Sequence, residues 1–181
     1  AVIVAHGILI AIRAVSEKKR FLADGIMLAV LIGFLVSLMN FWRIYTTDYR
    51  RDFSFAWQYG YREAADYLKK RTDIYEKVVF TKKYGEPHEF MLFYLKYPPE
   101  KYHEESDKRT DFHADWYWVD GFGKFEFVND WDMPLKTKNL LTEGKRTLVF
   151  TSPNNYTAGG VKLGTINFLN ETPAFDIVEY K

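Results

Sequence analysis

The chain has 181 residues, enough for one domain of ordinary size and a small membrane part. Its formal net charge is +1, and no basic run with interleaved aromatic residues stands out, which argues against nucleic acid as a partner. It contains no cysteine, which excludes a disulfide framework and a thiolate nucleophile or metal ligand. Because the chain begins with Ala1 and not with methionine, we expect a fragment or a processed protein.

The most apolar stretch runs from Gly25 to Trp42 and contains no charged residue. As a helix rising about 1.5 Å per residue it covers about 27 Å, close to the ~30 Å hydrocarbon core of a bilayer. Its apolar side chains point to every side, which is typical of a lipid-facing helix, and Trp42 and Tyr45 follow where interfacial aromatics gather. We therefore predict a transmembrane helix, with the buried core helix of a soluble domain as the alternative.

A second apolar run, Ala1 to Ile12, is too short to cross a bilayer alone, and we expect it to be the tail of a longer span. The loop from Arg13 to Arg20 carries four positive residues, and three arginines follow the longer span, so the positive-inside rule favours a cytoplasmic loop. This predicts a transmembrane hairpin over residues 1–47, ending a multi-pass domain in the cell membrane. Residues 48–181 then form an extracytoplasmic α/β domain.

The polar part alternates helical and strand patterns. An amphipathic helix is expected over residues 55–71 with Ser54 as N-cap, and a second from His88 to about Lys96 after Pro87. Residues 100–114 have no hydrophobic period and indicate a surface loop. A short helix near residues 135–141 ends at Gly144. Strands are predicted at residues 77–81, 116–119, 124–128, 147–151, 161–168 and 174–180.

The fold class that follows is α/β with membrane helices. One complete and one truncated transmembrane helix precede a small domain with a mixed sheet and helices on at least one face.

The most informative polar stretch is Phe80 to His88, where a strand runs through a turn into a helix N-terminus. Unpaired backbone N–H groups and two lysines meet there, which suits a phosphate or a sugar. The predicted substrate-binding residues are Lys82, Lys83, Tyr84 and His88. An ordinary strand-to-helix turn is the alternative interpretation.

Imidazole and carboxylate side chains gather between His103 and Asp115, but their spacing matches no metal motif, and a solvated loop is the better interpretation. The sequence has no G-x-S-x-G turn, no P-loop and no G-x-G-x-x-G. We therefore assign no catalytic residue and no metal ligand to this chain.

Three segments together resemble the C-terminal end of the family 39 membrane glycosyltransferases, the protein O-mannosyltransferase-like, C-type (GT-C) enzymes of prokaryotes. The first is the last span leading into Trp57–Ala65, and the second is Val78–Pro87 with Phe93–Pro99. The third is the closing hairpin, Lys162–Ile166 with Pro173–Phe175. The resemblance covers nearly the whole chain.

The resemblance implies an enzyme of protein glycosylation in the cell envelope, which uses a polyprenyl-phosphate-linked sugar at the outer membrane–water boundary. The catalytic acidic residue of such enzymes lies in their first extracytoplasmic loop, often with a divalent metal, so it would precede Ala1. This chain would be the non-catalytic end of the transferase, with the lipid bilayer and the lipid-linked sugar as partners. The alternative is a membrane-tethered, exported binding or sensor module without enzymatic activity.

Overall fold

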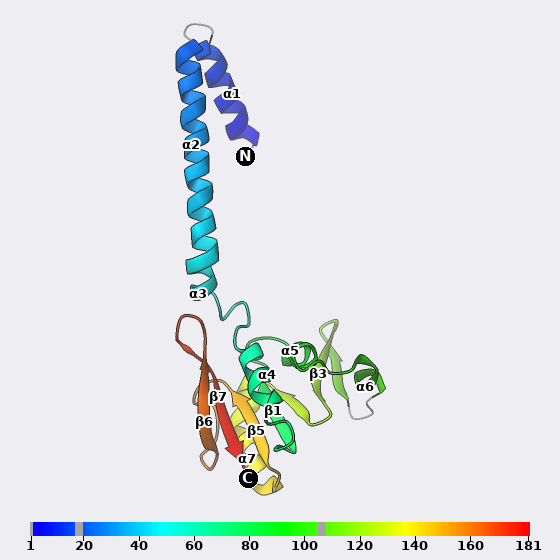
Figure 1. Ribbon diagram of the computed structural model, residues 1–181. Helices are drawn as coiled ribbons and strands as arrows, with labels where there is room; N and C mark the ends of the chain where they lie inside the picture. Colours follow the sequence, from blue (N-terminus) through cyan, green and yellow to red (C-terminus); the bar gives the residue numbers. More distant parts are fainter. Residues whose placement is uncertain (1, 17–19, 105–107) are drawn as a thin grey trace. The chain divides into compact units, whose positions relative to one another are not determined.

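The structure is a computed structural model that describes residues 2–16, 20–104 and 108–181 (Figure 1). The chain divides into two compact units, Ala1–Arg50 and Arg51–Lys181, which we call unit 1 and unit 2. Unit 1 is helical, and unit 2 is a mixed α/β domain built on a seven-stranded sheet.

Unit 1 contains helices α1 (Val2–Ser16) and α2 (Arg20–Ile44), followed by a π-helical turn η1 (Tyr45–Tyr49). Helix α3 (Arg50–Asp52) continues the same run into the start of unit 2. The continuous helical run Arg20–Asp52 has 33 residues and a mean hydropathy of 2.4 in its most apolar window, so it is long and apolar enough to cross a membrane. Almost every side chain of α2 is exposed, and Ala23 is its buried residue. The helix is longer at both ends than the apolar stretch Gly25 to Trp42.

The sheet of unit 2 has the strand order β2-β3-β4-β1-β5-β7-β6. Strands β4, β1 and β5 run parallel, and β2, β3, β6 and β7 join by antiparallel pairs. The bounds are β1 Lys77–Thr81, β2 Arg109–His113, β3 Trp116–Phe122, β4 Phe125–Val128, β5 Thr147–Thr151, β6 Val161–Asn167 and β7 Pro173–Tyr180. The expectation of a mixed sheet is confirmed.

Helices cover both faces of this sheet. Helices α4 (Tyr61–Lys69) and α5 (Pro87–Tyr94) bury side chains against the face that includes Phe80 and Phe150. Helix α7 (Met133–Glu143) packs on the other face, against Val79 and Val149, because successive side chains of a strand point to opposite faces. Helix α6 (Pro99–Glu104) and the 3₁₀ turn η2 (Asp130–Asp132) complete the unit.

The chain winds in two directions from β1. It passes through α5, α6, β2 and β3 to reach β4 on one side of β1, then crosses through α7 to β5 on the other side. The crossover helices α5 and α7 lie on opposite faces, as in doubly wound α/β folds. This topology brings the carboxyl ends of β1, β4 and β5 to one end of the sheet, which we call the carboxyl end.

Two local predictions are wrong, namely the loop over residues 100–114 and the start of the helix expected over residues 55–71, which begins only at Tyr61. Residues 100–114 are not a loop throughout, because α6 and β2 form within this range, and the ladder with β3 stabilises β2 although the strand lacks an apolar pattern. The N-cap of α4 is Gly60, with a φ of 109°, and not Ser54. The Ser54 hydroxyl instead accepts a hydrogen bond from the Leu169 N–H at 3.2 Å and donates one to the Arg51 carbonyl at 2.9 Å.

Candidate functional site

The candidate site lies at the carboxyl end of the sheet, between β1 and β5. The connection that leaves β1 runs toward the β4 side of the sheet, whereas the connection that leaves β5 runs toward β7 and β6, so the point between β1 and β5 is a topological switch point. In open α/β sheets, ligands bind in the crevice beyond the carboxyl ends of strands at such a point. The polar residues that follow β1, β4 and β5 are therefore the first to consider.

Asp130, just after β4, is the centre of the polar groups at this end. Its Oδ1 accepts a 2.7 Å hydrogen bond from the Thr81 hydroxyl, and its carbonyl oxygen accepts a 2.6 Å bond from Asn155 Nδ2. Burial by itself raises the pKa of Asp130, but hydrogen bonds from Ser152 and Thr81 and the charge of Lys83 outweigh it and bring the pKa below its ordinary value. Asp130 is consequently an ionised hydrogen-bond acceptor at neutral pH.

The side chain of Lys82 is buried and paired within unit 2. Its side chain is 8% exposed, its ammonium forms an ion pair with Asp120 of β3, and it lies 6.0 Å from the centre of the Trp118 ring. Removing Asp120 would leave a buried charge without its counter-ion, which is costly. The contacts of Lys82 therefore give it a structural role in joining β1 to β3.

Lys83 is the more accessible of the two lysines. Its side chain is 44% exposed, with Nζ 3.5 Å from Asp130 Oδ2, and its backbone N–H donates a 3.2 Å hydrogen bond to the Thr81 hydroxyl. The two lysines pair with carboxylates from different parts of the sheet. A ligand at the carboxyl end could therefore replace Asp130 as the partner of Lys83, whereas Lys82 is too buried for such an exchange.

Tyr84 points into the packing between the sheet and the closing hairpin. Its hydroxyl donates a 3.0 Å hydrogen bond to the Ala174 carbonyl, and its ring lies edge-on to Phe168 and Phe175 at 5.3 and 5.1 Å. Burial and the nearby Asp130 raise the pKa of Tyr84 to about 12. These contacts hold the start of β7 against the end of β1.

His88 lies in the first turn of α5, beside an acidic N-cap residue. Its Nδ1 is 3.3 Å from Glu86 Oε2. Burial lowers the pKa of His88, while the charges of Glu86 and Glu89 act in the opposite direction. His88 is therefore neutral at pH 7, and the Glu86 carboxylate sits at the helix end where an anion was expected to bind.

A buried hydroxyl belongs to the same neighbourhood. Tyr61, the first residue of α4, is 1% exposed and stacks on Phe90 of α5 with ring centres 4.6 Å apart. Burial, with the neighbouring Tyr84 and Glu86, raises the pKa of Tyr61. Among the described residues, its hydroxyl has no hydrogen-bond partner. The Tyr61 hydroxyl is thus a buried polar group on a ring surrounded by other aromatic side chains.

The structure does not gather the four predicted contact residues into one cradle. Lys83 faces Asp130, whereas Lys82, Tyr84 and His88 each contact a different partner. The sequence interpretation missed Asp130 and Thr81, although a polar residue directly after a buried strand is a signal that could have identified both. Asp120 carried no such signal, because its partner lies 38 residues away.

No metal site is found in the part of the chain that the structure describes, since no three of its His, Asp or Glu residues lie close enough to hold an ion. Two of the acidic residues between His103 and Asp115, namely Glu105 and Asp107, lie outside the described ranges.

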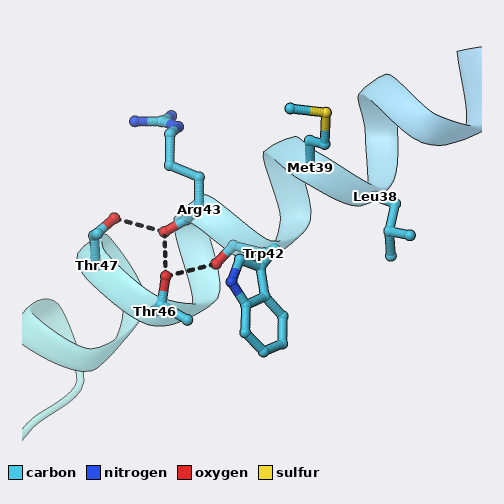
Figure 2. Close-up of a pocket in the computed structure, with 6 residues that line it drawn as sticks. All are labelled: Leu38, Met39, Trp42, Arg43, Thr46 and Thr47. Carbon is cyan, nitrogen blue, oxygen red and sulfur yellow. Dashed lines mark hydrogen bonds between the residues drawn. The ribbon is translucent and has the colours of Figure 1, made fainter.

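A separate shallow hollow lies in unit 1, along the last turns of α2 (Figure 2). The hydroxyl of Thr46 donates to the Trp42 carbonyl at 2.8 Å, and that of Thr47 donates to the Arg43 carbonyl at 2.6 Å. These hydroxyls give the two helix carbonyls hydrogen-bond donors at the point where α2 changes into the π-helical turn η1. The residues that line the hollow are Leu38, Met39, Trp42, Arg43, Thr46 and Thr47. Its apolar wall suits an acyl chain better than a polar substrate.

Comparison of the chain with models of protein families, with curated proteins and with solved structures gives no match.

Proposed function

We propose that this chain is the C-terminal portion of an integral membrane glycosyltransferase, which transfers a sugar from a polyprenyl-phosphate donor to an acceptor outside the cytoplasm. The observation that carries the proposal is the exposed apolar helix α2, which leads directly into an α/β unit rich in aromatic residues. The same order of elements underlies the family resemblance of the sequence.

A physical requirement of the reaction agrees with this arrangement. The donor is held in the bilayer by its polyprenyl chain, while water has to be kept from the carbon at which the sugar is transferred. A folded unit tethered at the membrane surface can cover such a site and guide the acceptor. In this proposal unit 2 lies outside the cytoplasm, and the catalytic acid and any divalent metal belong to segments that precede Ala1.

The direct test is the activity of the complete gene product, purified in detergent and supplied with a polyprenyl-phosphate-linked sugar. We expect transfer by the complete protein and none by residues 1–181 alone. Eight or more additional spans upstream, with an acidic residue in the first outer loop, would agree with the proposal. A start codon directly before Ala1 would contradict it and favour the tethered binding module.

A further inference from the structure

Exposed aromatic side chains are concentrated at the carboxyl end of unit 2. Seven of the eight large aromatic residues recorded as exposed among the described residues of this unit belong to three segments at that end, and the eighth, Phe93, is in α5. The seven are Phe53, Phe55, Trp57, Phe112, Trp116, Tyr117 and Trp131. Such a concentration marks an interaction surface, since soluble domains rarely expose large apolar patches.

The topology places all three segments at the same end of the sheet, with the β2–β3 turn at one edge and the β6–β7 turn at the other. The turn between β2 and β3 lies at the carboxyl end because β3 runs antiparallel to β4, and Trp131 follows β4 directly. The lead-in segment, residues 53–60, joins the same end through the β6–β7 turn. There Phe55 contacts Phe168, with ring centres 6.5 Å apart, and Ser54 bonds Leu169. The aromatic surface is thus also the end at which the chain enters unit 2.

The β2–β3 ribbon carries its aromatics on both faces. Strand β3 pairs with β4 at Gly121 and Phe122, whereas its outer part, from Trp116 to Val119, pairs with β2. Figure 1 shows this ribbon, beside the β3 label, extending past the neighbouring strand. Phe112 and Tyr117 lie on one face of the ribbon, with ring centres 4.7 Å apart. Trp116 lies on the other face, because successive residues of a strand alternate, and it is 58% exposed.

We propose that the carboxyl end of unit 2 contacts the headgroup region of the bilayer that α2 crosses, with the tip of the β2–β3 ribbon inserted at that level. The inference rests on the membrane span in the proposed function. Only eight residues, Phe53 to Gly60, separate α3 from α4, and even fully extended they reach no more than about 28 Å. The tether therefore keeps the start of α4 within about 28 Å of the end of the helical run that contains α2.

The chemistry of the surface favours a lipid interface as the occupant. Tyr and Trp combine an apolar ring with a polar group and are enriched where hydrocarbon meets water. A sugar would stack on one aromatic face, whereas this ribbon presents aromatics on two. Residues 108–117 carry two basic and two acidic side chains, so the tip has no net charge and suits zwitterionic phosphatidylcholine.

The test uses the whole chain in phosphatidylcholine nanodiscs that contain a lipid labelled with a nitroxide either at the headgroup or in the middle of an acyl chain. Because the chain has no cysteine, single variants can be labelled with an environment-sensitive fluorophore. Tyr117→Cys reports on the ribbon tip and Phe34→Cys on the middle of α2. Val161→Cys is the matched control, since Val161 is an exposed strand residue that pairs with Glu179 at the opposite end of the sheet.

We expect the label at position 117 to lose at least about half of its fluorescence to a headgroup-level nitroxide, and the label at 161 to lose almost none. Equal quenching at 117 and 161, or quenching at neither while position 34 is quenched, would overturn the inference and leave the span intact. Absence of quenching at position 34 by a nitroxide in the middle of the acyl chains would overturn the span itself. If the fluorescence of a label at position 117 is not quenched by the nitroxide lipid but changes when a mannose oligosaccharide is added, the surface binds carbohydrate instead.

Discussion

The hydroxyl of Thr81 donates a 2.7 Å hydrogen bond to Asp130 Oδ1 and so links the end of β1 to the residue that follows β4. Thr81 is fully buried, and the Asp130 carboxylate also faces Lys83. This contact holds two parallel strands together at the end of the sheet where the candidate site lies.

We predict that Asp130→Ala lowers the free energy of unfolding at pH 7 by about 1–3 kcal/mol, because it leaves the buried Thr81 hydroxyl without its acceptor. Since the folded-state pKa of Asp130 is lowered, its contribution is complete above the unfolded pKa of about 4 and is lost as the pH falls through the folded pKa. Denaturant unfolding of the whole chain in detergent micelles, at pH 7 and pH 3, measures both effects.

The control is Asp132→Ala, which removes an exposed carboxylate from the same turn; Asp132 is the N-cap residue of α7, but its side chain makes no cap hydrogen bond. We expect its unfolding free energy to stay within about 0.5 kcal/mol of that of the unmodified chain. A loss at Asp132 as large as that at Asp130, or a loss at Asp130 that is the same at both pH values, would refute the assigned contact.

Phe80→Ala should destabilise unit 2 by about 3–5 kcal/mol, because it opens a cavity in the core. Phe80 is fully buried and stacks on Phe150 with ring centres 4.4 Å apart and planes within 3°. Phe93→Ala, at a side chain that is 76% exposed, is the matched control and should change stability little. Comparable unfolding midpoints for the two variants would show that the assigned core is wrong.

Tyr61→Phe should leave the stability of unit 2 unchanged or raise it slightly. The ring keeps its stacking on Phe90, and the variant removes a buried hydroxyl that has no partner among the described residues. The same unfolding measurement checks this. A loss greater than about 1 kcal/mol would mean that the hydroxyl makes a hydrogen bond in solution.

If the site at the carboxyl end takes the phosphate of the donor, Lys83→Ala in the complete enzyme should raise KM for the donor about tenfold or more. A hydrogen bond to a charged group is worth about 1.5–3 kcal/mol, which supports that factor. Lys82→Ala should act mainly on stability, since its ammonium is buried against Asp120. Donor and acceptor kinetics that are unchanged by Lys83→Ala would remove Lys83 from the site.

The elements that sequence reasoning located best are those with continuous apolar patterns. Strands β1 and β5 match their predicted bounds, because each is a short β-branched and aromatic run that the sheet buries on both faces. Gly144, in the left-handed conformation with a φ of 62°, ends α7 as its position predicted. Strand β2 was missed because Asp111 and His113 give it no apolar period, and its stability comes from pairing with β3.

The site was harder to predict because its contacts join residues that are distant in sequence. The sequence suggests that Lys82 and Lys83 converge on one ligand. Their partners, Asp120 in β3 and Asp130 after β4, follow 38 and 47 residues later. Only the strand order, in which β4 lies beside β1, shows that these two carboxylates lie close enough to form ion pairs with the lysines.

The central claim is that α2 crosses the membrane and leaves unit 2 outside the cytoplasm. Single-cysteine variants of the complete protein, treated in intact cells with a membrane-impermeant maleimide, test it directly. We predict that Lys145→Cys, in unit 2, is labelled in intact cells, and that Arg20→Cys, at the start of α2, is labelled only after permeabilisation. Labelling of Arg20→Cys but not of Lys145→Cys in intact cells, or recovery of the protein in the soluble fraction, would contradict the account.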